Sequence, residues 1–253
     1  MNHSEKTYQK IIYPPERDDF LIDLKRKVDH YFNVNNINKY ANVGFYLKAV
    51  FLLALYIGLY LNFLLSPSSN YATLGYVFMG PIAIIIGLNV AHDAAHDIIS
   101  RRRWVNHLFL HVFDFLGASS AIWKKRHVES HHQHSNILNE DADLKQTPLV
   151  RIFPDDEIRK VNKFQHLYMP LVFLHYTIFW LLFRDFQDLK NKGKGTSLVI
   201  ELTRKEFWTM ILFKLFYFTY ILIIPMIFSP LYCWQVFVAY ILMNWLAGIT
   251  ITL

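Results

Sequence analysis

The chain has a single cysteine, Cys233, which lies in an apolar run. One thiol excludes disulfides within the chain, iron–sulfur clusters and thiolate zinc sites. The sequence also lacks repeats, low-complexity tracts and a glycine-rich phosphate loop, which argues against repeat proteins and P-loop nucleotide-binding proteins. Residues 1–17 have no apolar core and contain Pro14 and Pro15, so we do not expect a cleavable signal peptide there.

Charged residues make up only 18% of the chain, whereas 53% of the residues are hydrophobic and 17% are aromatic. This balance favours a membrane protein over a soluble one. A helix of ~20 residues crosses a hydrocarbon core of ~30 Å. We therefore predict an all-α integral membrane protein in which four transmembrane helices form two hairpins. The four predicted spans are Phe45–Leu65, Leu74–Val90, Phe207–Phe228 and Leu231–Leu253.

Lysine and arginine are distributed unevenly between the connections. The turns inside the hairpins, at residues 66–73 and 229–230, contain neither, whereas the other connections are rich in both. The positive-inside rule then places the amino terminus and residues 184–205 in the cytoplasm. The net charge of +6 is mainly this orientation signal and suits contact with anionic lipids. Because the bases are spread over membrane-flanking loops, we expect no nucleic-acid partner.

Two further apolar stretches, Trp104–Trp123 and His166–Phe183, are predicted not to cross the membrane. Crossing by the first would put the histidine clusters described below on opposite faces, and crossing by the second would turn the bases of residues 184–205 outward. We expect both to be interfacial or re-entrant helices in a cytoplasmic cap.

Residues 1–44 are assigned to a cytoplasmic amphipathic segment and residues 45–253 to one membrane domain. The apolar residues of the first segment recur at helical spacing, so a helix there lies either on the membrane or on the protein's own cap. These residues are Phe20, Leu21, Leu24, Val28, Tyr31 and Phe32.

Five histidines form two clusters, His92 with His96 and His127 with His131 and His132. Residues four apart share one helix face, so each cluster directs two imidazoles toward one place, and His132 adds a third direction. Such groups at a membrane edge are costly and are usually functional, which favours metal ligands over structural residues. Imidazole suits iron, zinc, copper and nickel alike. Three histidines outside the clusters are interpreted as structural: His107, His111 and His175.

These motifs resemble the integral-membrane fatty acid desaturases of the acyl-lipid and acyl-CoA type, which include linoleoyl-CoA desaturases. The segment His92-Asp93-Ala94-Ala95-His96 is similar to the first histidine box of that family. Residues 123–132 are similar to the second box, and Ser135-Asn136 and an acidic pair at residues 140–143 follow as in the family.

The resemblance implies a cytoplasmic di-iron centre whose ligands here are His92, His96, His127, His131 and His132. It also implies an activity: the centre takes electrons from ferredoxin or cytochrome b5, uses dioxygen, and introduces a double bond into an acyl chain carried by CoA, a carrier protein or a lipid. The remaining site candidates would hydrogen-bond the ring nitrogen that does not bind metal and so orient the histidines. The acids among them have an alternative interpretation as solvated side chains that pair with nearby bases. These candidates are Asp93, Asp97, Glu129, Asn136, Asp141 and Asp143.

The sequence departs from the family in three places. Asp97 follows the first box where a small or neutral residue is common, and His134 stands where an aromatic residue is common. The third histidine box is missing, because no histidine follows His175. We therefore expect a desaturase truncated before that box, with weak iron binding and little activity alone. Two alternatives are a related membrane hydroxylase or ketolase and a non-catalytic membrane scaffold.

Overall fold

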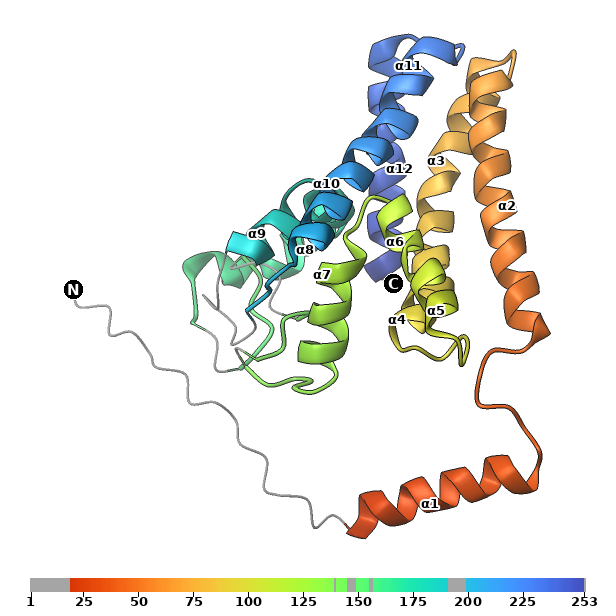
Figure 1. The fold of residues 1–253 in the computed structure, drawn as a ribbon. Helices are drawn as coiled ribbons and strands as arrows, with labels where there is room; N and C mark the ends of the chain where they lie inside the picture. Colours follow the sequence, from red (N-terminus) through yellow and green to blue (C-terminus); the bar gives the residue numbers. More distant parts are fainter. Residues whose placement is uncertain (1–18, 139, 145–148, 155–156, 191–198, 253) are drawn as a thin grey trace.

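The computed structural model describes residues 19–138, 140–144, 149–154, 157–190 and 199–252, and within these ranges the chain forms helices and connections without a strand (Figure 1). The α-helices are α1 (Asp19–Val34), α2 (Val43–Leu65), α3 (Ser69–Ile86), α4 (His92–Ala95), α5 (Arg103–Leu110), α6 (Val112–Phe115), α7 (Ser120–Lys124), α8 (Gln165–Phe179), α9 (Asp185–Lys190), α10 (Arg204–Phe218), α11 (Ile224–Phe228) and α12 (Cys233–Thr252). Four π-helical segments and one 3₁₀ segment interrupt or extend them: η1 (Gly87–Ala91), η2 (Lys125–His131), η3 (Lys160–Phe164), η4 (Trp180–Arg184) and η5 (Thr219–Ile223). The prediction of an all-helical chain is confirmed for the described residues.

Five helices of the described chain are long and apolar enough to cross a membrane. Four of them coincide with the predicted spans: Val43–Leu65, Asn70–Ala95, Arg204–Phe228 and Cys233–Thr252. The fifth, Lys160–Lys190, contains the stretch predicted to be interfacial. Length and composition alone qualify this helix, so its interfacial placement stays a prediction.

The stretch Trp104–Trp123 is not one helix. It is divided among α5, α6 and α7, none of which is long enough to cross a membrane. Gly117 makes the break, because its backbone has φ +91° and a Cβ there would lie 2.8 Å from Cγ of Tyr217. After the break, the ring of Trp123 contacts that of His92 at the start of α4.

Close contacts between backbones hold α12 against its neighbours. A Cβ at Gly80 of α3 would collide with the carbonyl oxygen of Met243, and one at Gly248 would collide with the carbonyl oxygen of Phe173 in α8. Small residues at such crossings are typical of membrane helices, which gain stability from tight packing. The carboxyl-terminal helix is therefore fixed between α3 and α8.

The core between α2, α3 and the helix of α10 and η5 is rich in tyrosine. Phe63 stacks on Tyr76 with ring centroids 4.1 Å apart. The hydroxyls of Tyr56 and Tyr220 are 3.2 Å apart, and the hydroxyl of Tyr60 donates to the carbonyl oxygen of Tyr220 at 2.7 Å. These contacts give the buried phenols hydrogen-bond partners within the bundle.

Helix α1 forms where the amphipathic pattern predicts it. None of its residues is buried, and its apolar side chains Phe20, Val28 and Tyr31 are exposed. Figure 1 shows α1 standing apart from the helical bundle. Its existence as a helix is confirmed, whereas the surface that its apolar face contacts stays a prediction.

Candidate metal centre

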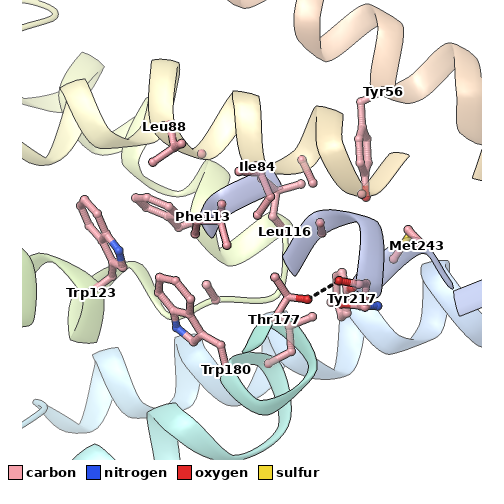
Figure 2. Close-up of a pocket in the computed structure, with 18 residues that line it drawn as sticks. Tyr56, Ile84, Leu88, Phe113, Leu116, Trp123, Thr177, Trp180, Tyr217 and Met243 are labelled. Carbon is pink, nitrogen blue, oxygen red and sulfur yellow. Dashed lines mark hydrogen bonds between the residues drawn. The ribbon is translucent and has the colours of Figure 1, made fainter. Parts of the chain in front are cut away.

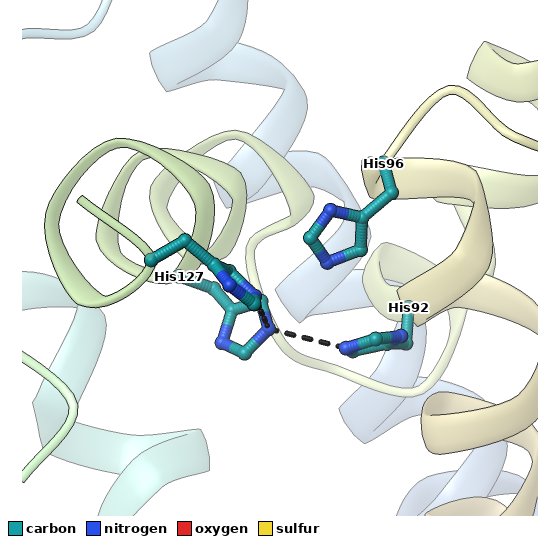
Figure 3. Close-up of side chains that lie close together, drawn as sticks. His92, His96 and His127 are labelled. Carbon is teal, nitrogen blue, oxygen red and sulfur yellow. Dashed lines mark hydrogen bonds between the residues drawn. The ribbon is translucent and has the colours of Figure 1, made fainter. Parts of the chain in front are cut away.

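The two histidine clusters meet at one end of the bundle, opposite the turns that join α2 to α3 and α11 to α12 (Figures 1 and 3). His92 begins α4, directly after the π-helical segment η1, and His96 caps its end. His127 and His131 belong to η2, which continues α7. Two helices that are distant in sequence therefore contribute imidazoles to one place.

The ring nitrogens of four histidines converge. Nε2 of His127 lies 3.1 Å from Nε2 of His92 and 3.0 Å from Nε2 of His132. His96 completes the set, and one nitrogen from each of the four rings lies within 4.8 Å of the others. His131 belongs instead to a second group with His127 and Asp143.

The pairing of His127 with His132 follows from the π-helical turn. The amide of His132 donates to the carbonyl oxygen of His127 at 3.0 Å, a bond that spans five residues rather than four. Such a turn brings residues i and i+5 onto one face and is frequent at functional sites. His127 therefore shares one group of converging nitrogens with His132, and it shares the second group with His131.

In three histidines of the two groups, the ring nitrogen Nδ1 lies next to a carboxylate. Nδ1 of His127 donates to Asp143 at 2.8 Å, and Nδ1 of His131 donates to Asp141 at 3.0 Å. Nδ1 of His92 lies 3.3 Å from Oδ1 of Asp93. A carboxylate behind an imidazole fixes the ring orientation and leaves the lone pair on Nε2. Three of the predicted orienting acids therefore have the contacts expected of them.

The geometry of these lone pairs fits a metal ion. With the protons on Nδ1, Nε2 of His92 and Nε2 of His127 point lone pairs at each other across 3.1 Å, which is repulsive unless a cation lies between them. Two nitrogens bound at right angles to one octahedral ion, at about 2.1 Å each, are about 3.0 Å apart. The donor set present therefore suits one transition-metal ion.

The other predicted site residues have different surroundings. Asp97 is exposed, has φ +57°, and pairs through Oδ2 with Lys124 at 2.8 Å rather than with a histidine. Asn136 contributes its backbone, because its amide donates to Asp141 at 2.9 Å. Glu129 is exposed and has no histidine contact in the described part of the chain.

The remaining histidines lie outside both groups. His111 donates to Asp114 at 2.7 Å and stacks on Phe213. His175 pairs its Nδ1 with the carbonyl oxygen of Leu171 at 2.8 Å, and its ring contacts Trp245. His107 is exposed, and His134 also belongs to neither group.

Burial and the neighbouring imidazoles lower the pKa of His96 and of His132 below the ordinary value of 6.5. Both rings are therefore neutral near pH 7, the form that binds metal. Because protons compete with metal, we expect protonation of His96 and His132 to weaken Fe(II) binding only below pH 6.5. The fall should be up to about tenfold per pH unit for each proton displaced. Equilibrium titrations of the purified chain at several pH values measure this, and a decline that begins above pH 7 would contradict it.

An apolar cavity of about 120 Å³ lies beside the histidines, between α3, α12 and the helix of α8 and η4 (Figure 2). Trp123 and Trp180 lie at one end, and Tyr56 and Met243 lie at the other. Trp123 joins the cavity to the metal centre, because its ring stacks on His127 with centroids 4.4 Å apart and contacts His92 at 5.8 Å. An apolar chain in this cavity would reach the imidazoles past this indole.

The fatty acid desaturase family model matches residues 68–252 of the chain, well over half of its length. This chain belongs to the fatty acid desaturase family. The match includes both histidine clusters and the acidic pair that follows the second. As a family member with five long apolar helices among its described residues, the chain is an integral membrane protein.

Curated relatives agree with this assignment. The chain is 31% identical to an sn-1 linoleoyl-lipid 6-desaturase of Arthrospira platensis over 84% of its own length and 58% of the relative. It is 28% identical to an acyl-lipid (8-3)-desaturase of Physcomitrium patens over 85% of its own length and 45% of the relative. The chain therefore spans about half the length of these relatives. No solved structure matches it.

Several residues of the site were not singled out from the sequence. They are Trp123, Trp180, Arg126 and Asp188, which contact the histidines, line the cavity or hold the acids behind the rings. The aromatic richness of the chain hides individual tryptophans, and Asp188 is far from the boxes in sequence. Arg126 is adjacent to His127 in the sequence, but its burial becomes visible only in the structure.

Proposed function

We propose that the chain is the metal-binding and acyl-binding part of a membrane desaturase that introduces a double bond into an acyl group. The convergence of four imidazole nitrogens beside an apolar cavity carries this proposal. His92, His96, His127, His131 and His132 would hold the metal, with Asp93, Asp141 and Asp143 behind them. A di-iron centre is the form that the family resemblance suggests.

Iron bound here would supply the dioxygen chemistry that removes two hydrogens from adjacent methylenes. The chain's own residues orient the metal-binding rings and keep water away from the acyl chain. Asp143 and Asp141 keep the Nδ1 protons of His127 and His131 in place, which presents Nε2 of both rings. The apolar cavity excludes water from the acyl chain, and Trp123 separates the cavity from bulk solvent at the metal end.

The relatives suggest the form of the substrate and the setting. Since two of them are named for acyl-lipid or linoleoyl-lipid substrates, we assign the chain an acyl group esterified to a membrane lipid. The histidine end of the bundle would face the cytoplasm, residues 45–253 would form the membrane domain, and residues 1–44 would remain cytoplasmic. The exposed bases Arg101, Arg102 and Arg103 would suit docking of an acidic electron donor, a ferredoxin or a cytochrome b5.

Product analysis tests the reaction class. Because the chain alone is expected to have little activity, the test uses a full-length desaturase that contains it. Membranes with that protein, linoleoyl lipid, a reduced donor and ¹⁸O₂ should yield a lipid with one more double bond and no ¹⁸O. An oxygenated lipid would indicate a hydroxylase or ketolase instead. A purified protein that binds no iron and forms no product would indicate the scaffold.

Filling the cavity should impair the reaction without emptying the metal centre. Ala83 of α3 lines the cavity, so Ala83→Phe should reduce lipid desaturation roughly 10- to 100-fold, because small displacements of a reacting group can cost about 100-fold. Iron content should be unchanged. Ala54→Phe is the matched control, since Ala54 is exposed on α2 and its substitution should alter neither quantity. Equal activity of both variants would show that the acyl chain lies elsewhere.

A further inference from the structure

Two arginines are buried beside the metal centre, and both donate to one carbonyl oxygen. Nη2 of Arg126, in η2, lies 2.8 Å from the oxygen of Ala142, and Nη2 of Arg184, at the end of η4, lies 3.1 Å from it. Ala142 stands between the two carboxylates that hold His131 and His127, Asp141 and Asp143. The arginines therefore fix the backbone that carries both of these acids.

A single carboxylate in α9 joins the two arginines. Asp188 places Oδ2 3.3 Å from Nε of Arg126 and Oδ1 3.3 Å from Nε of Arg184. The side chains of the arginines are only 3% and 8% exposed, and that of Asp188 is 13% exposed. Two like charges at such depth repel each other and lose hydration, so a shared anion is required to keep them there.

The same network reaches His127. Arg126 also pairs through Nη2 with Oδ1 of Asp143 at 3.2 Å, while Oδ2 of Asp143 accepts from Nδ1 of His127 at 2.8 Å. Asp143 is thus divided between an arginine and a histidine. Without the charge of Asp188, Arg126 would attract the carboxylate of Asp143 more strongly and pull it away from Nδ1 of His127. The ring of His127 would then lose the hydrogen bond that sets its orientation.

We propose that Asp188 is a positioning residue of the metal centre, acting through Arg126 and Asp143 on His127. It connects the helix Lys160–Lys190 to the second histidine cluster, although it touches no metal-binding nitrogen. The inference rests on the proposed function, because it requires that the histidines bind a metal.

Asp188→Asn tests this proposal, because it keeps the side chain's shape and removes its charge. Fe(II) affinity of the purified chain should fall about tenfold, at the low end of the ~10- to 100-fold cost of losing a group behind a metal ligand. The ligand-field absorption of bound Co(II) should shift as well, because His127 is reoriented. Asp188→Glu retains the charge and should fall between Asp188→Asn and the unaltered chain. This variant also preserves the test if Asp188→Asn does not fold.

Asp185→Asn is the matched control. Asp185 lies in the same helix, is 1% exposed, and pairs with the buried Lys214 at 2.8 Å rather than with the arginines. This variant should unfold at a lower temperature, yet its folded fraction should show the Co(II) spectrum of the unaltered chain. An unchanged affinity and spectrum in both Asp188 variants, or an equal spectral shift in Asp185→Asn, would overturn the positioning role alone. A failure of the unaltered chain to bind Fe(II) and Co(II) would overturn the proposed function with it.

Discussion

Replacement of His127 by alanine in a full-length desaturase that contains this chain is expected to abolish metal binding and, with it, desaturation. Nε2 of His127 lies 3.1 Å from that of His92 and 3.0 Å from that of His132. Among the described residues His127 alone belongs to both groups of potential ligands. Its loss removes a donor and also leaves Asp143 without the ring it orients. We expect Fe(II) affinity to fall by more than about 100-fold, beyond the range for groups that act from behind a ligand.

His107→Ala is the control for this variant. His107 is an exposed imidazole on α5 and belongs to neither group, so its removal changes the histidine count by the same amount without touching the centre. Metal content measured on both purified variants separates the two cases. An equal loss of iron in His107→Ala would mean that the ligand set is misassigned, and retained iron and activity in His127→Ala would remove the basis of the proposed function.

The second large effect is expected from Gly80→Ala, which should prevent α12 from packing against α3. The added Cβ would collide with the carbonyl oxygen of Met243, and a backbone atom in a long helix cannot turn aside as a side chain can. Overpacking of this kind costs about 1–3 kcal/mol and occasionally more. We expect a lower midpoint of thermal unfolding in detergent and a smaller monodisperse fraction on size-exclusion chromatography.

Gly58→Ala provides the comparison for the packing variant. Gly58 is also in an apolar helix, α2, but a Cβ there would meet nothing within 4 Å. Since alanine has the higher helix propensity, this variant should be neutral or slightly more stable. If Gly80→Ala unfolds at the same temperature as Gly58→Ala, then α3 and α12 do not approach as closely as described.

Much of the fold was predictable because an apolar run of about 20 residues is by itself evidence of a long membrane helix. The four predicted spans coincide with long helices for this reason. The stretch Trp104–Trp123 has a similar composition, yet it breaks at Gly117 because its conformation is decided by a contact with Tyr217 on α10. In the helix Lys160–Lys190 two sequence properties point in opposite directions, since its length and composition suit a membrane span while the distribution of bases favours an interfacial position.

The site was predictable to the extent that it depends on residue type. Clustered histidines with acids nearby predict a metal site. In the structure Asp143 and Asp141 accept hydrogen bonds from His127 and His131. A spacing of 3.6 residues per turn pairs His127 with His131, and the π-helical η2 brings His127 together with His132 as well. Contacts made across the fold, such as those of Asp188 with two arginines, leave no local pattern in the sequence to be found.

The π-helical segment η2 allows the set of inward-facing imidazoles to change by a small change in chain length. A π-helical turn holds about one residue more than an α-helical turn, so deletion of a single residue within η2 would restore regular winding there and change which residues of that turn face the bundle, while the residues on either side keep their faces. The ends of the helix would hardly move, and the surrounding bundle would be preserved. Members of a lineage could in this way exchange which imidazoles face inward through one-codon insertions and losses, with the scaffold unaltered.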